Sequence, residues 1–140
     1  MKRRIRNALH GVLRTAHGTV ELAAGDSDND DIVMLAPIPS NAAVPSLFIG
    51  SDTFGGSCTF NVGIYTTAGV VKDEDVFATS VADAAAMADV RFEAADIDTA
   101  GKKMWELAGD SSDPGGYFYI AITFNATGGT AGTLNWNINY

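Results

Sequence analysis

The alternation of apolar and polar side chains in the last third of the chain constrains the fold more than any other feature. Along residues 117–124 every second residue is Phe or Ile, and along 134–140 Leu, Trp, Ile and Tyr alternate with three asparagines. Successive side chains of a β-strand point to opposite faces of its sheet. Both segments are therefore predicted to be strands with one face on a hydrophobic core.

Similar short runs, bounded by Gly, Pro, Asn and Asp, occur along the rest of the chain. A chain of 140 residues has room for one hydrophobic core, and its 15 glycines suit tight turns between strands. Counting the runs gives about seven or eight strands with long middle connections. The predicted fold is all-β, an antiparallel β-sandwich of jelly-roll type. Besides the two segments above, the clearest runs are 19–23, 32–37, 44–50 and 58–65.

Two short helices are predicted between these strands. Ser80 and Asp83 resemble a capping box before the alanine-rich stretch 81–88. A second helix is predicted over 102–108, ended by Gly109.

The N-terminal segment 1–17 differs from the rest in charge and in period. Its apolar residues recur at the spacing of one helical face, which predicts a basic amphipathic arm. Arginine, asparagine and histidine interrupt the apolar residues, so the segment lacks the run of about 7–15 apolar residues of a secretory signal. Such an arm can lie on a membrane, contact nucleic acid, dock on an acidic partner or pack as a terminal segment of the domain. The domain organisation predicted is an arm at 1–17 and one sandwich at 18–140.

The sandwich itself is strongly acidic. Residues 15–140 hold 4 basic and 17 acidic side chains, a net charge of −13. Such a body repels nucleic acid phosphates, so no nucleic-acid partner is predicted. No apolar run approaches the roughly 20 residues that span a bilayer, and no membrane partner is predicted either.

Nucleophilic catalysis would need a base beside the nucleophile, and both imidazoles, His10 and His17, lie in the arm. The single cysteine, Cys58, falls on the core side of its predicted strand. One cysteine and two histidines cannot supply a structural zinc site without carboxylates, and no phosphate-binding glycine motif is present. The chain is predicted to be a non-enzyme without cofactor.

The acidic loop 25–31 is the best candidate for a metal site. Asp26, Asp28 and Asp30 have the spacing that opens an EF-hand calcium loop, but Asp31 and Pro37 replace its glycine and its bidentate glutamate. A solvated turn is the favoured interpretation, and calcium held by these aspartates, or by Asp110 and Asp113, is the alternative.

Tyr117 and Tyr119 alternate with the apolar face of their strand. Tyrosine is enriched at protein interfaces, so an interface is as well supported as a place in the core. The segments 38–42 (IPSNA), 61–65 (NVGIY), 105–117 (WELAGDSSDPGGY) and 131–134 (AGTL), in this order, resemble those of the small capsid decoration, or cement, proteins of tailed bacteriophages.

This resemblance implies a virion protein, made in the host cytoplasm, that sits on the outer capsid surface as a homo-oligomer, with a trimer favoured. It would stabilise the shell by docking across major capsid protein subunits. The family brings no catalytic residues. The basic arm fits this role if it reaches across an acidic groove of the capsid. The docking residues are predicted from the arm's own basic and apolar side chains and not from the family: Arg3, Arg4, Ile5, Arg6, Leu9, Leu13 and Arg14.

Two other functions stay open from the residues alone. A carbohydrate-binding jelly roll, in a head fibre or a tail adhesion module, would bind glycans through Tyr117 or Tyr119, with calcium in an aspartate loop. A hydrolase with two catalytic carboxylates is kept because 17 acidic residues are available.

Overall fold

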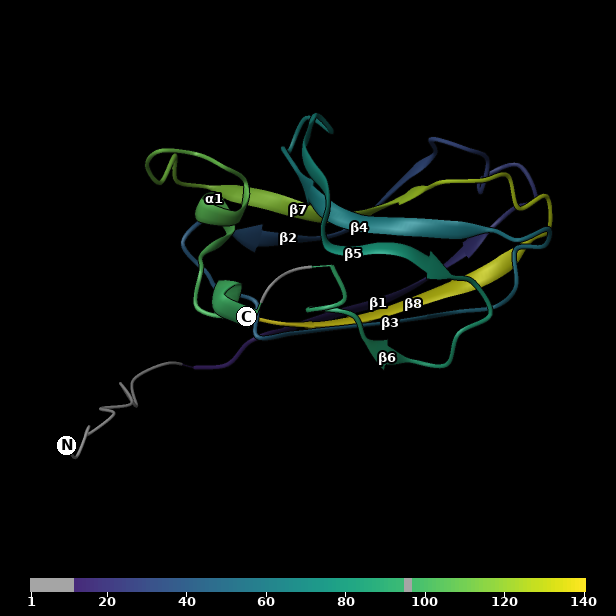
Figure 1. Cartoon of the computed structure of the whole chain (residues 1–140), viewed down its shortest axis with the longest axis horizontal. Helices are drawn as coiled ribbons and strands as arrows, with labels where there is room; N and C mark the ends of the chain where they lie inside the picture. The colour runs from purple at the N-terminus through teal and green to yellow at the C-terminus, as the bar shows by residue number, and fades with distance from the viewer. Residues whose placement is uncertain (1–11, 95–96) are drawn as a thin grey trace.

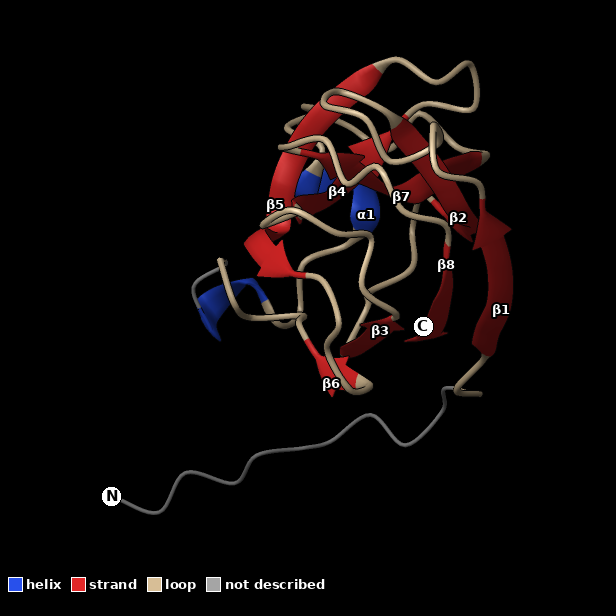
Figure 2. Ribbon diagram, turned by 90° about the vertical axis from the view of Figure 1, so that its right-hand side faces the viewer, coloured by secondary structure: helices blue, strands red, loops and turns tan. Residues whose placement is uncertain are grey.

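The computed structural model describes residues 12–94 and 97–140. They form two four-stranded antiparallel sheets packed face to face, which confirms the predicted β-sandwich (Figures 1 and 2). The eight strands are β1 (Thr15–Leu22), β2 (Ile32–Pro39), β3 (Ser46–Ser51), β4 (Thr59–Tyr65), β5 (Val71–Ala82), β6 (Ala88–Asp89), β7 (Tyr117–Phe124) and β8 (Gly132–Asn139).

The strand order is that of a jelly roll. One sheet has the order β1-β8-β3-β6 and the other β2-β7-β4-β5. The first strand pairs with the last, the second with the seventh, the third with the sixth and the fourth with the fifth. The chain is thus one long antiparallel hairpin rolled across two sheets, and the β3–β8 and β4–β7 pairs join its two halves.

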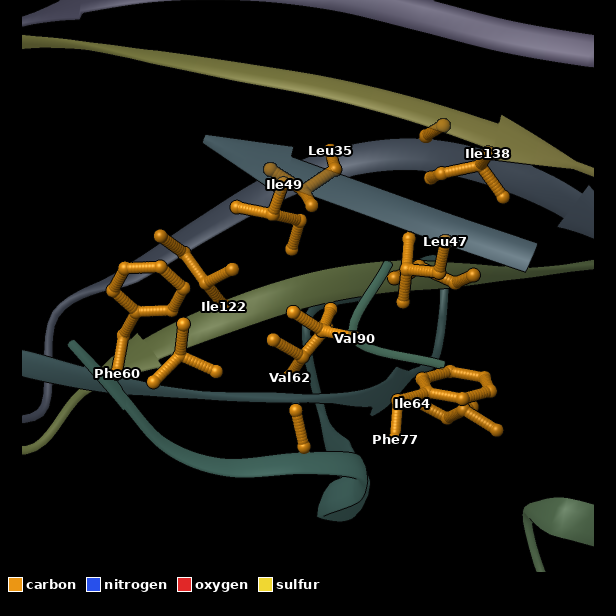
Figure 3. Packing of buried hydrophobic residues seen from close by; sticks show 14 of the residues in the cluster. Leu35, Leu47, Ile49, Phe60, Val62, Ile64, Phe77, Val90, Ile122 and Ile138 are labelled. Carbon is orange, nitrogen blue, oxygen red and sulfur yellow. The ribbon is translucent and has the colours of Figure 1, made fainter. Parts of the chain in front are cut away.

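The core lies between the two sheets, and both contribute to it. Figure 3 shows Leu47, Ile49 and Ile138 of the first sheet facing Val62 and Ile122 of the second. The apolar rows predicted in β7 and β8 all point into this layer, although Trp136 is only half-buried. Burial of these alternate side chains is the main force that holds the sheets together.

The connection between β6 and β7 holds the helical elements. The predicted helix near 102–108 is confirmed as α1 (Met104–Leu107), and Gly109, with φ of 75°, ends it. A 3₁₀ turn, η1 (Ile97–Thr99), precedes it. In the described part of the chain no helix has the length and apolarity required to cross a bilayer.

The helix predicted over 81–88 is wrong. β5 continues to Ala82, where Val81 pairs with Phe60, and the chain then turns into β6. Ser80 and Ala84 have φ of 54° and 56°, which no right-handed helix contains. Pairing with β4 and burial of Val81 outweigh the helical preference of alanine.

The predicted boundary of the arm at residue 17 is also wrong. β1 begins at Thr15, and its pairing with β8 starts at Thr15 opposite Asn139. Residues 15–17 therefore belong to a strand and not to an amphipathic helix. Ala16 fits the helical spacing of the apolar residues in 1–17, but it is half-buried because its side chain points inward from β1. The arm positions 1–11 lie outside the described residues.

The strand predicted over 58–65 is confirmed as β4, with one face in the core and the other outside it. The charged run 72–75 is predicted to be solvated, but only Lys72 and Glu74 are exposed. Asn61 and Tyr65, on the outer side of β4, are buried, and Asp73 and Asp75 are half-buried within β5. The β4–β5 register shifts several times, and the first half of β5 lies against Gly63. A Cβ atom on Gly63 would lie 2.1 Å from the carbonyl oxygen of Asp73.

Gly63→Ala should therefore destabilise the fold by about 1–3 kcal/mol, because the new methyl group meets backbone atoms that cannot rotate away. Gly25→Ala is the matched control, since a Cβ atom there has no neighbour within 4 Å. Denaturant unfolding measures both free energies. Equal stability of the two variants would show that β5 does not press on β4 at this point.

Candidate interaction surfaces

The place where the arm joins the sandwich carries an exposed apolar surface. Arg14 is held to the sheet through its backbone, which exchanges hydrogen bonds of 2.7 and 2.9 Å with Tyr140. The two preceding residues leave the sheet, and Val12 and Leu13 are 86% and 65% exposed. With Ala43, Pro45 and Tyr140 they line a hollow of about 300 Å³, called the arm-exit patch below.

The arm-exit patch has a polar neighbour. A second hollow of about 290 Å³ shares Val12 and Tyr140 and adds Arg14, Pro39, Asn41 and Ala42. Leu13 and Arg14 are the predicted arm residues that the structure describes. The others, Arg3, Arg4, Ile5, Arg6 and Leu9, lie outside the described residues.

Sequence reasoning did not find Ala43, Pro45 or Tyr140 as surface residues. They come from segments far apart in the chain and meet because β8 pairs with both β1 and β3. No local pattern in the sequence signals such a meeting.

The predicted interface tyrosines lie on the outer side of β7, facing away from the core. Tyr117 is 57% exposed and Tyr119 is half-buried. Their partners on β2 are Pro39 and Pro37, so prolines flank both aromatic rings along the sheet. The structure places both tyrosines outside the sandwich core, where an interface or a ligand could reach Tyr117.

Tyr117 also borders a polar groove of about 440 Å³. One wall is formed by Thr66 and Thr67 of the β4–β5 turn with Lys72 of β5, and the other by residues 110–112, 114 and 115. The Nζ atom of Lys72 lies 2.7 Å from Oδ1 of Asp110, an ion pair that joins the two walls. Serine hydroxyls, a charged pair and an aromatic side chain give this groove the polar groups and the flat surface that suit a sugar.

Asp113 fixes the second wall of the groove. Its Oδ1 atom accepts hydrogen bonds from the Ser40 hydroxyl at 2.6 Å and from the Gly115 N–H at 2.9 Å. The two bonds hold the pKa of the Asp113 carboxyl below its ordinary value of 3.8, and the bond from Ser40 has the larger effect. Asp110 and Asp113, an alternative calcium pair in the sequence, are thus engaged with Lys72 and with Ser40.

The acidic loop uses two of its carboxylates to close its own turns. Oδ2 of Asp26 accepts the Ala23 N–H at 2.8 Å, and Oδ2 of Asp31 accepts the Asp28 N–H at 2.9 Å. Asp30 has a φ of 69°. Within residues 12–94 and 97–140, no three His, Cys, Asp or Glu side chains come close enough together to hold a metal ion.

Cys58 and His17, two of the side chains considered for catalysis, lie in different surroundings. The Cys58 thiol is buried and donates to the Ala126 carbonyl at 3.3 Å. Burial raises its pKa, and Asp83 raises it further. His17 is exposed on β1, opposite Asn137 of β8. His10 lies outside the described residues.

Comparison with known proteins does not place the chain in a family. No protein-family model matches the chain, and no curated protein matches it. Among solved structures it is similar to one described as "Cyanophage Pam1 capsid asymmetric unit", with 15% sequence identity and a TM-score of 0.48. The alignment covers 99% of this chain and 93% of that chain. A likeness of this size assigns neither a family nor a function.

The groove wall yields a prediction about Asp113. A carboxyl with a lowered pKa in the folded state stabilises the fold above its unfolded pKa, and this contribution is lost as the pH falls through the folded value. The amide signal of Gly115 in an NMR titration should follow this carboxyl, with a midpoint below 3.8. Ser40→Ala should move the midpoint upward, because the hydroxyl no longer stabilises the carboxylate. Ser111→Ala in the same wall is the control, and an equal upward shift there would contradict the assignment.

Proposed function

We propose that the chain is a non-enzymatic structural protein of a tailed-bacteriophage virion. It decorates the outer capsid surface as a homo-oligomer and stabilises the shell by docking across major capsid protein subunits. The arm-exit patch is the observation that carries the proposal. It is an apolar hollow of the sandwich at the end of the segment 1–14, which holds five basic residues.

The chemistry of the patch supports docking. Val12 and Leu13 gain free energy only when a partner covers them, and contiguous exposed apolar surface marks sites of interaction. The five basic residues before residue 15 add attraction to an acidic partner surface and set the orientation of binding. Many copies, each adding a modest free energy, would stabilise a shell through its joints.

The non-enzymatic part of the proposal rests on where reactive groups lie. The Cys58 thiol is buried and its raised pKa disfavours the thiolate, which is the reactive form. His17 stands on an exposed sheet face, opposite an asparagine. Neither placement provides the nucleophile beside a base that acyl transfer requires.

A shell-binding assay tests the proposal directly. The chain is co-expressed with the major capsid protein of the same genome, and shells are sedimented to measure bound copies and affinity. Leu13→Asp should weaken binding about tenfold or more, since it places a charge in the apolar contact. Val70→Asp is the matched control, because Val70 is also exposed but lies on the β4–β5 turn. Equal binding by both variants, or no binding by the unmodified chain, would contradict docking through the patch.

The groove beside Tyr117 favours a second function, a carbohydrate-binding module of a head fibre or tail. The unmodified chain should then bind glycans on an array. Tyr117→Ala should lose most of that signal, because the exposed tyrosine ring supplies the apolar surface on which a sugar ring packs. Glycan binding measured with and without a chelator tests whether it depends on calcium. The absence of any glycan signal would contradict this function and leave shell docking unaffected.

A further inference from the structure

The two sheets have four outer edges, and three of them carry features that prevent pairing with another strand. β6 is only two residues long. β2 contains Pro37 and Pro39 and a register shift between Met34 and Ala36. β5 has repeated register shifts and a run of acidic side chains. Short strands, proline, bulges and charge are the usual means of protecting a sheet edge.

β1 has none of these features. It runs eight residues without proline, and its register with β8 is unbroken from Thr15 to Leu22. Figure 2 shows it at the outer edge of its sheet, with β8 on one side only. β8 is the one strand that pairs with β1 among the residues that the structure describes.

The unpaired backbone groups of β1 can be identified from the alternation of an antiparallel ladder. Arg14 and Tyr140 exchange both hydrogen bonds, so the even-numbered residues of β1 are bonded to β8. The N–H and C=O groups of Thr15, His17, Thr19 and Glu21 therefore point away from β8, towards the free edge.

Side chains of β1 do not cover this edge. The Thr15 hydroxyl donates to Asn139 at 2.8 Å and the Thr19 hydroxyl donates to Asn135 at 2.7 Å. Glu21 accepts the Thr133 hydroxyl at 2.7 Å. All three bonds lead back across the sheet to β8, which leaves the backbone of the edge accessible.

We propose that β1 pairs with β1 of a second copy, antiparallel and about a two-fold axis, so that two sheets become one continuous sheet. The outer face of β1 carries His17 in its first half and Glu21 in its second. Antiparallel pairing places His17 of one copy diagonally across from Glu21 of the other, whereas parallel pairing would set His17 against His17 and Glu21 against Glu21.

The register that uses the whole strand places Gly18 on the two-fold axis. His17 then lies opposite Thr19 of the second copy, and Thr15 opposite Glu21. On the inner side, the half-buried Ala16 lies opposite the half-buried Val20 of the second copy. The lack of a side chain at Gly18 leaves room for the Trp136 ring, which would lie 2.3 Å from a Cβ atom there.

Two measurements on the full chain test this pairing. Sedimentation over a wide concentration range should show dimers, or hexamers if the chain also forms trimers, that dissociate on dilution. Amide exchange should slow at Thr15, His17, Thr19 and Glu21 in the associated protein and quicken on dilution. The alternate amides of β1, bonded to β8, should stay protected in both states.

Thr19→Pro removes one N–H from the free edge and none that bonds to β8, so it should abolish the association. Thr19→Val is the matched control, since it removes the hydroxyl and keeps the N–H, and it should still associate. If Thr19→Pro fails to fold, the exchange pattern of the unmodified chain decides. A monomer or trimer whose mass does not depend on Thr19→Pro would overturn the proposal. Protection of the odd-numbered amides at every dilution would also overturn it, because the edge would then be covered without a second copy.

Discussion

The pairing of β1 with β8 is the contact on which the rest of the structure depends. It joins residues 15–22 to 132–139, nearly the whole length of the chain apart, and an unbroken register runs through it. The pairing closes the rolled hairpin and brings Leu134 and Ile138 over the core. It also brings Tyr140 beside Arg14, which creates the arm-exit patch. A long loop must be closed before this contact forms, so its stability comes from the buried apolar rows.

The fold class was predictable because apolar alternation in β4, β7 and β8 is strong and the strands are separated by clear turns. Errors arose where tertiary contacts outweigh local preference. The alanines after Val81 favour a helix on their own, yet β4 draws Val81 and Ala82 into a strand. Asp73 and Asp75 read as a solvated run, although the first half of β5 presses on Gly63 and half-buries them. Neither of these contacts between strands can be inferred from the order of residues within one segment.

The candidate surfaces were predictable only in part. Alternation with Phe118 leaves Tyr117 and Tyr119 open between the core and an interface, and the structure places both outside the core. Leu13 and Arg14 follow from the charge and apolar content of the first residues, whereas Ala43, Pro45 and Tyr140 reach the same patch through strand pairing alone. The free edge of β1 likewise becomes visible only when all four edges are compared. Local sequence thus identifies the type of surface, and topology identifies its members.

The central claim is that docking stabilises a shell, and calorimetry of the shell tests it most directly. Shells of the major capsid protein from the same genome are heated alone and after saturation with this chain. The account predicts that saturation raises the temperature at which the shells come apart, since a ligand that binds only the assembled state stabilises it. An unchanged transition in shells that carry the bound protein would contradict it.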